Sequence, residues 1–250
     1  MGPDEFRIAP RPEPALLPPM RRTPLSPASY SLRLQPSRGL LAALTFCLSL
    51  ASAPILPAAD TAPSPPPSKE RQLFDGKTLR GWAVTDFAGH GEVHVQKGLL
   101  VLEQGYLTGV TWTNATPKTN YELSLEASRV SGNDFFCGLT FPIANTNVTL
   151  IVGGWGGGVV GISSIDGNDA SSNETTKFMS FEKDRWYAIR VRVTPKKLEA
   201  WIDKEKVVDL ATEGKTLGLR SGPIEESVPL GIATYETQAH LRHIKLTELP

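Results

Sequence analysis

The chain has 250 residues with 26 basic and 26 acidic side chains, so its formal net charge is zero. No run or stripe of Lys and Arg occurs, which argues against nucleic acid as a partner, because such a surface needs clustered positive charge. Only one of the two cysteines, Cys137, lies in the part that reads as a folded domain. No disulfide is therefore expected within that part.

Residues 1–59 have the composition of an N-terminal extension that carries an export signal. An apolar segment, residues 39–53, follows Arg33 and Arg38 and ends in small residues. A basic stretch, a short apolar run and an Ala-x-Ala site are typical of a secretory signal peptide. The run is shorter than the about 20 apolar residues that span a bilayer, and a membrane anchor is the alternative interpretation. We expect a secreted or periplasmic protein that meets the membrane only through this signal segment.

The Pro-rich stretch at residues 60–70 predicts a semi-rigid linker, and one domain is expected at residues 71–250. After residue 59 the chain holds 20 basic and 23 acidic residues, a net charge of about −3. An Asp-Gly turn is predicted at residues 75–76, because glycine accepts a positive φ without a steric clash.

Residues 121–128 alternate apolar and polar side chains, as do residues 187–193 and 198–203, which is the period of strands with one buried face. Lys97-Gly98 predicts a tight hairpin turn. Helix is expected to be scarce, because no apolar spacing of three and four residues is sustained. Shorter strands are predicted at 92–96, 99–103, 108–113, 147–152, 158–163, 228–235 and 239–247.

So many short strands predict an all-β fold, a sandwich of two antiparallel sheets. Such a sandwich often leaves one curved sheet open to solvent, and its outer face could form a groove. Cys137 is predicted to be a buried, inert thiol that shares a strand face with Phe135, Leu139 and Phe141.

The segment Leu73–Trp82 reproduces the pattern Leu-Phe-[Asn/Asp]-Gly-Lys-x-Leu-x-Gly-Trp. It resembles the opening of the 3-keto-disaccharide hydrolase domain family (DUF1080), and weaker matches follow at residues 94–100, 120–126, 184–189, 198–209 and 231–249. The resemblance implies a concanavalin A-like jelly roll that is exported and cleaves 3-keto-disaccharides. In that chemistry a base removes the C2 proton, which the C3 ketone acidifies, and the C1 substituent leaves.

The resemblance also implies that residues 133–142 and 148–155 are strands that line the groove. The family's arginine is missing from the first of these segments and its acidic residue from the second. A non-catalytic, lectin-like carbohydrate-binding module is therefore the alternative to an enzyme, and a purely structural surface domain is a third reading.

Candidate catalytic residues are His94 and Glu92, which share one strand face by alternation, and Asp166 and Asp169 in the polar loop at residues 165–174. The oxygen-rich loop could also bind Ca²⁺, although it lacks the EF-hand pattern and a solvated loop is the default. We predict no further metal site.

Trp155, between glycines, is predicted either to stand exposed as a platform for a sugar ring or to lie against the sheet. Arg190, Arg192 and Trp201 are further candidates for substrate binding, because they alternate with buried residues and so face outward. The expected partner is a carbohydrate, a disaccharide or a larger glycan.

Overall fold

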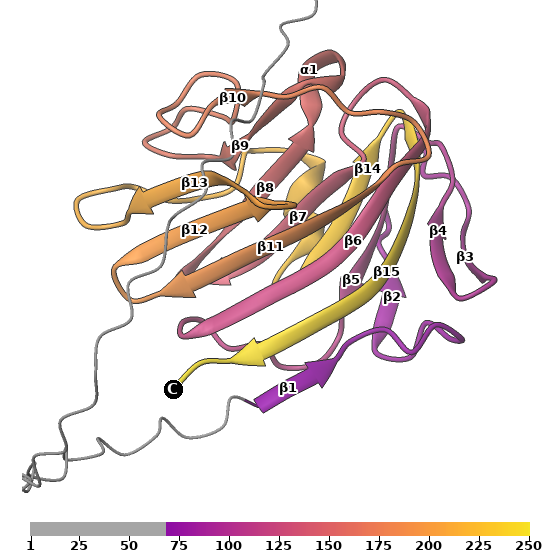
Figure 1. The fold of residues 1–250 in the computed structure, drawn as a ribbon, viewed down its shortest axis with the longest axis horizontal. Coiled ribbons are helices and arrows are strands. Elements are labelled where there is room, and N and C mark those ends of the chain that lie inside the picture. The colour runs from indigo at the N-terminus through magenta and orange to yellow at the C-terminus, as the bar shows by residue number, and fades with distance from the viewer. Residues whose placement is uncertain (1–68) are drawn as a thin grey trace, which may run out of the picture. The chain divides into compact units, whose positions relative to one another are not determined.

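The computed structural model describes residues 69–250, which form an all-β, jelly-roll sandwich of two antiparallel sheets (Figure 1). The predicted extension, signal segment 39–53 and most of the predicted linker lie outside the described residues. The first strand begins at Lys69, two residues before the expected start of the domain. Within residues 69–250, no helix is long and apolar enough to cross a membrane.

The first sheet, called sheet A, has eight strands in the order β13-β12-β11-β6-β15-β4-β3, with β1 paired to β15. Its long central strands, β6, β11 and β15, run across the front of Figure 1. Their bounds are β1 Lys69–Gln72, β3 Val93–Gln96, β4 Leu99–Leu102, β6 Tyr121–Gly132, β11 Trp186–Thr194, β12 Lys197–Ile202, β13 Glu205–Ala211 and β15 Thr237–Glu248.

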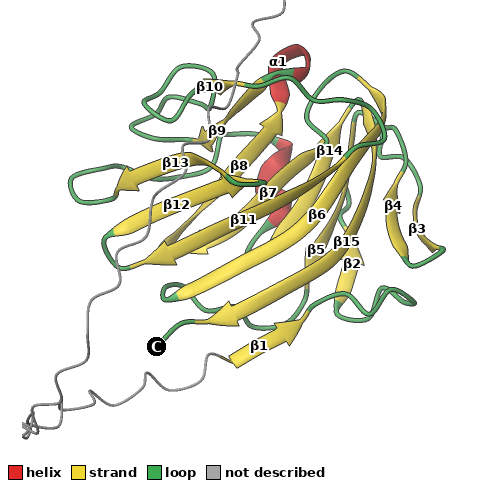
Figure 2. Ribbon diagram, viewed as in Figure 1, coloured by secondary structure: helices red, strands yellow, loops and turns green. Residues whose placement is uncertain are grey.

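The second sheet, sheet B, has seven strands in the order β10-β9-β8-β7-β14-β5-β2. Its strands are β2 Trp82–Val84, β5 Leu107–Trp112, β7 Cys137–Ile143, β8 Thr146–Gly153, β9 Val159–Ser163, β10 Lys177–Phe178 and β14 Gly231–Tyr235. The two short helical segments of the described part are α1 Gly154–Gly157 and η1 Pro223–Ser227, drawn red in Figure 2. The expectation of little helix is confirmed for this part of the chain.

The main core lies between the sheets and is built by the alternation that the sequence shows. Every second residue is buried along β11 and from Tyr121 to Ala127 of β6, and the intervening residues face outward. Tyr121, at the start of β6, is fully buried, and its hydroxyl donates a hydrogen bond to the carbonyl of Pro142. Burial raises the pKa of this phenol well above its ordinary value.

The predicted opening turn is present. The carboxylate of Asp75 accepts hydrogen bonds from the main-chain N–H groups of Lys77 and Thr78, both at 2.7 Å. These hydrogen bonds lower the pKa of Asp75 to about 2. The indole N–H of Trp82 closes the segment by donating to the carbonyl of Leu73 at 2.8 Å. The hydrogen bonds within the Leu73–Trp82 motif therefore hold together the segment that connects β1 to β2.

Two details of the strand prediction are corrected. Phe135 does not share the face of Cys137. Phe136 and Cys137 both enter the main core, whereas Phe135 packs outside sheet B, because β7 begins only at Cys137 and the alternation starts there. The predicted strand 228–235 starts at Gly231, since Pro229 has no N–H to give to a ladder.

Candidate functional site

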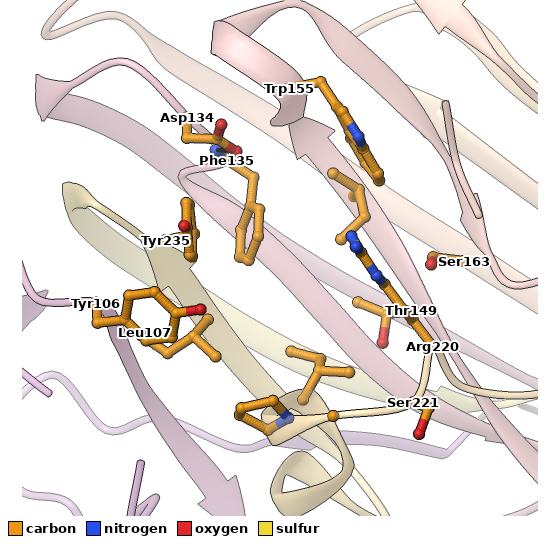
Figure 3. A pocket seen from close by; sticks show the side chains of 14 residues that line it. Tyr106, Leu107, Asp134, Phe135, Thr149, Trp155, Ser163, Arg220, Ser221 and Tyr235 are labelled. Carbon is orange, nitrogen blue, oxygen red and sulfur yellow. Dashed lines mark hydrogen bonds between the residues drawn. The ribbon is translucent and has the colours of Figure 1, made fainter. Parts of the chain in front are cut away.

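A pocket of about 480 Å³ lies on the outer face of sheet B, the face turned away from the main core. Strands β5, β8, β9 and β14 supply its floor, and the segment at residues 220–224 crosses over one side. Figure 3 shows its lining side chains, which are Tyr106, Leu107, Asp134, Phe135, Thr149, Ile151, Trp155, Ser163, Arg220, Ser221, Gly222, Pro223, Ile224 and Tyr235.

The floor consists mainly of small, uncharged residues. Thr149 of β8 stands opposite Ser163 of β9 in the strand register, and its hydroxyl shares a hydrogen bond of 2.8 Å with Thr140 of β7. The Ser163 hydroxyl is buried and makes no hydrogen bond within the described protein. Gly138 and Gly161 stand on either side of Ile151 in the next register row. Small side chains here leave room above the sheet for a ligand.

Trp155 stands on a tight turn at one end of the pocket. Although α1 is helical by its hydrogen bonding, Trp155 has φ 49° and ψ 56°, and Gly156 has φ 83° and ψ 20°. A tryptophan in the left-handed region is uncommon, and such outliers gather at functional sites. The side chain is 40% exposed. Of the two predicted placements, the exposed one is observed.

Asp134 holds this turn in place. One carboxylate oxygen accepts from the N–H of Phe135 at 2.7 Å, and the other accepts from the N–H of Gly156 at 3.0 Å. The carboxylate therefore lies beside the turn that carries Trp155, at the edge of the pocket (Figure 3).

An aromatic wall forms the opposite side. The rings of Tyr106 and Tyr235 meet edge to face with centroids 5.2 Å apart, and Phe135 stacks on Tyr235 at 5.9 Å. Burial, the charge of Glu236 and the neighbouring Tyr106 raise the pKa of Tyr235. Its phenol is therefore uncharged at neutral pH and can donate a hydrogen bond.

Arg220 is the cation among the lining residues and Asp134 is the anion. The guanidinium of Arg220 lies 5.8 Å from the ring of Trp155, and its Nη1 atom is 3.8 Å from the carboxylate of Asp169. Figure 3 shows Trp155 and Arg220 together on the side facing Tyr106 and Tyr235. The pocket thus combines exposed aromatic rings, one cation, one carboxylate and hydroxyls.

The sequence-predicted catalytic residues lie outside this pocket. His94 and Glu92 face the solvent side of sheet A, with Nδ1 of His94 3.7 Å from the Glu92 carboxylate. Asp166 accepts a hydrogen bond from the N–H of Thr216 at 2.8 Å and lies in the loop after β9. Asp169 lies nearer to the pocket than Asp166 does, because its carboxylate pairs with the lining residue Arg220.

Arg190, Arg192 and Trp201 lie on the outer face of sheet A. Both guanidinium groups bond the carboxylate of Glu122 at 2.8 Å, and Arg190 also covers the ring of Trp201 at 3.8 Å. These residues lie on a different sheet from the pocket, because β11 and β12 belong to sheet A and β8 belongs to sheet B, and their part in substrate binding stays a prediction. Alternation along a strand shows that a residue faces outward, but not from which sheet.

The same face carries a second charge cluster at a bulge in β15. The register shifts between Arg242 and Lys245, so that Arg242 and His243 both reach Glu126, at 2.7 and 3.2 Å. Burial alone would raise the pKa of Glu126, but the hydrogen bonds from Arg242 and His243 outweigh it and lower the pKa. Paired charges of this kind are typical of a solvated sheet face.

The oxygen-rich loop at residues 165–174 is held by its own hydrogen bonds. The side-chain amide of Asn173 donates to the carbonyls of Ile162, Asn168 and Asp169, at 2.7, 3.1 and 2.8 Å. Across residues 69–250, His, Cys, Asp and Glu side chains form no group of three or more that could hold a metal ion. Ca²⁺ binding by this loop stays a prediction, and we derive no chemistry through it.

Comparison with known families gives one decisive match. The sequence model of the 3-keto-alpha-glucoside-1,2-lyase-like domain matches residues 69–247. The chain belongs to this family. No curated protein matches the chain.

The solved structures that align with this 3-keto-alpha-glucoside-1,2-lyase-like domain share little sequence with it. A protein of Parabacteroides distasonis described as a glycosyl hydrolase has 13% identity and a TM-score of 0.46, with 72% of this chain and 94% of that chain covered. A beta-1,3-glucanase from Mycobacterium marinum has 10% identity and a TM-score of 0.48, covering 72% and 99%. A carbohydrate-binding module from Bacillus subtilis has 10% identity and a TM-score of 0.42, covering 66% and 94%. Similarities this low support no statement about activity.

Sequence reasoning found Trp155 but missed the residues that surround it in this lyase-like domain. Asp134 and Tyr106 stand next to strands, Tyr235 ends β14, and Arg220 lies in the long connection from β13 to β14. The only available signal was the resemblance, which implied that residues 133–142 and 148–155 line the groove. Asp134, Phe135, Thr149, Ile151 and Trp155 do line it.

Proposed function

We propose that the domain binds the sugar of a 3-keto glycoside in the pocket on sheet B and cleaves it by elimination. The observation that carries the proposal is the placing of a carboxylate, Asp134, and a guanidinium, Arg220, around a pocket whose walls are aromatic. Membership of the lyase-like family supplies the reaction type. Sugar rings stack on aromatic faces, and Trp155 offers an exposed one.

The chemistry requires a base and a group that stabilises negative charge. The base takes the C2 proton, the C–H electron pair forms a C1–C2 double bond, and the bond from C1 to the glycosidic oxygen breaks. The departing oxygen takes a proton from solvent, so the products are an unsaturated 3-keto sugar and an alcohol. Negative charge develops on the ketone oxygen as the proton leaves, and a cation beside that oxygen lowers the barrier.

Asp134 is the base in this proposal and Arg220 stabilises the enolate oxygen. Each oxygen of Asp134 keeps a lone pair free after accepting one main-chain hydrogen bond. Arg220 supplies the guanidinium group, and its neighbour Asp169 orients it with a carboxylate 3.8 Å from Nη1. Ser163 and Thr149 lie in the floor of the pocket beneath the sugar.

A carbohydrate-binding module without chemistry is the second candidate. The observation in its favour is that no histidine lines the pocket and that both oxygens of Asp134 already accept main-chain hydrogen bonds, one of them from Gly156 in the Trp155 turn. In that reading the carboxylate shapes the site, and the aromatic rings with the hydroxyls hold the glycan.

Incubation of the purified chain with a 3-keto disaccharide that has an α-glucosidic bond separates the two candidates. Release of the unsaturated 3-keto sugar, followed by chromatography, supports the lyase. Asp134→Asn should then lower kcat at least a hundredfold, since a general base contributes about 10²–10⁴. Glu92→Gln, on the other sheet, is the matched control and should leave kcat unchanged. Glycan binding without any turnover would establish the module.

Export is a separate proposal that rests on the apolar segment at residues 39–53. It is tested by fractionating cells that express the whole chain and sequencing the mature N-terminus. A mature protein that starts after the small residues near 53 agrees with a cleaved signal, whereas an intact N-terminus in the cytosolic fraction contradicts it.

A further inference from the structure

The pocket has two chemically different ends. Arg220 lies at the end that carries Trp155, and Asp134 accepts a hydrogen bond from Gly156 in the Trp155 turn while standing on the side of Tyr235 (Figure 3). The other end is formed by Tyr106, Leu107 and Tyr235, together with the η1 segment. Figure 3 shows Tyr106, Leu107 and Tyr235 on one side, and Trp155 and Arg220 across from them.

The second end rests on a hydrophobic cluster of its own. Leu107 packs with Phe87 and Ala233 in a cluster separate from the main core, and Ile224 and Tyr235 pack against it. Tyr106 extends this surface, because its ring meets Tyr235 edge to face at 5.2 Å and its side chain is 53% exposed. An exposed aromatic ring continuous with a packed apolar cluster is a surface prepared for an apolar group.

The polar groups at this end are few. Away from Asp134, which lies beside Tyr235, the lining side chains at this end are those of Tyr106, Leu107, Pro223, Ile224 and Tyr235, whose only polar groups are the two phenol hydroxyls. A second sugar ring would bring several hydroxyls into this space, and each buried hydroxyl without a partner is unfavourable. An aromatic ring brings no such groups and gains edge-to-face contacts with the tyrosines.

We infer that the site takes a glycoside whose leaving group is aromatic rather than a second sugar. This inference rests on the proposed function, because it takes the sugar to lie at the Trp155 end between Asp134 and Arg220. The aglycone ring then lies against Tyr106 and Tyr235, with Ile224 beneath it. It departs as a phenol when the bond from C1 to the glycosidic oxygen breaks, and its oxygen takes the proton from solvent.

The test measures binding without turnover. The purified chain is titrated by calorimetry with 4-nitrophenyl α-glucoside, methyl α-glucoside and a disaccharide with an α-glucosidic bond. These compounds carry a C3 hydroxyl in place of the ketone, so their C2 proton is not acidified and differences in leaving-group ability do not enter. We expect the aryl glucoside to bind at least tenfold more tightly than the other two.

Substitutions in the pocket test where the aromatic ring of the leaving group lies. Tyr106→Ala and Ile224→Ser should reduce the tenfold preference to less than threefold, while the affinity for methyl α-glucoside stays within twofold. Tyr106→Phe should retain the preference, because it keeps the ring and removes only the hydroxyl; a phenol that binds a sugar hydroxyl predicts the opposite. Phe178→Ala is the matched control, since Phe178 is 79% exposed on β10 and outside the pocket.

Equal affinity for the three glycosides, or tighter binding of the disaccharide, overturns the inference. So does a preference that survives both Tyr106→Ala and Ile224→Ser, because the ring would then lie elsewhere. Absence of binding by all three also overturns it. The lyase proposal is judged separately, by turnover of a 3-keto disaccharide, which can succeed when the aromatic preference fails.

Discussion

The turn that presents Trp155 depends on a glycine whose replacement can be worked out from the structure. Gly157 has φ 105°, and a Cβ atom there would lie 2.8 Å from Nη1 of Arg129 and 3.0 Å from Oδ1 of Asn133. Gly156, its neighbour in the same turn, has φ 83° and nothing within 4 Å of such an atom. The pair therefore separates backbone strain from steric conflict.

Alanine at either position must adopt a left-handed backbone, which costs about 1–2 kcal/mol. At Gly157 the new methyl group also conflicts with the Arg129 guanidinium, which is 6% exposed and donates to the carbonyl of Phe181. Losing a hydrogen bond from a charged group costs about 1.5–3 kcal/mol. Gly157→Ala should thus lower the free energy of unfolding by about 2.5–5 kcal/mol in all, and Gly156→Ala by about 1–2 kcal/mol.

Urea denaturation, followed by circular dichroism, measures both values, and calorimetry with a glucoside shows whether the turn still presents Trp155. Binding is measured without urea, where both variants are folded. We expect Gly157→Ala to weaken glycoside binding at least tenfold and Gly156→Ala to weaken it less than threefold. Equal losses of stability in the two variants would refute the steric reasoning.

Three further predictions concern the frame around the site. The pKa of Glu126 is lowered in the folded chain, so its pairing with Arg242 and His243 stabilises the fold above the unfolded pKa near 4.5, and this stabilisation is lost as pH falls through the folded pKa. Glu126→Gln should therefore lower the free energy of unfolding by about 0.5–1 kcal/mol at pH 7 and leave it unchanged at pH 2, as denaturation curves would show. Cys137 is fully buried with its pKa raised to about 12, so a thiol reagent at pH 8 should modify it only after urea is added; rapid labelling of the peptide that contains Cys137 in the folded chain would contradict this. Tyr121→Phe leaves a buried main-chain carbonyl without its donor and should cost about 1–3 kcal/mol in the same assay, and an unchanged urea midpoint would show that the hydrogen bond contributes nothing.

Local signals along the chain were enough to determine the class of fold. Alternation in β6, β11 and β12 depends only on which side chains are apolar, and a strand places neighbours on opposite faces wherever it lies. The Lys97-Gly98 turn is likewise local, because both residues have positive φ between β3 and β4. The family motif was legible for the same reason: its hydrogen bonds, such as those of Asp75, close within a few residues.

The site was decided by the tertiary structure. Asp134, Trp155, Arg220 and Tyr235 are far apart in sequence, and they meet only because β8 and β14 both pair with β7 and because the chain from β13 crosses the outer face of sheet B. Residue alternation could not tell that Arg190 faces outward from the other sheet, since that depends on pairings between distant strands. Those pairings follow from burying one continuous core between two sheets, which is a property of the whole chain and not of any segment.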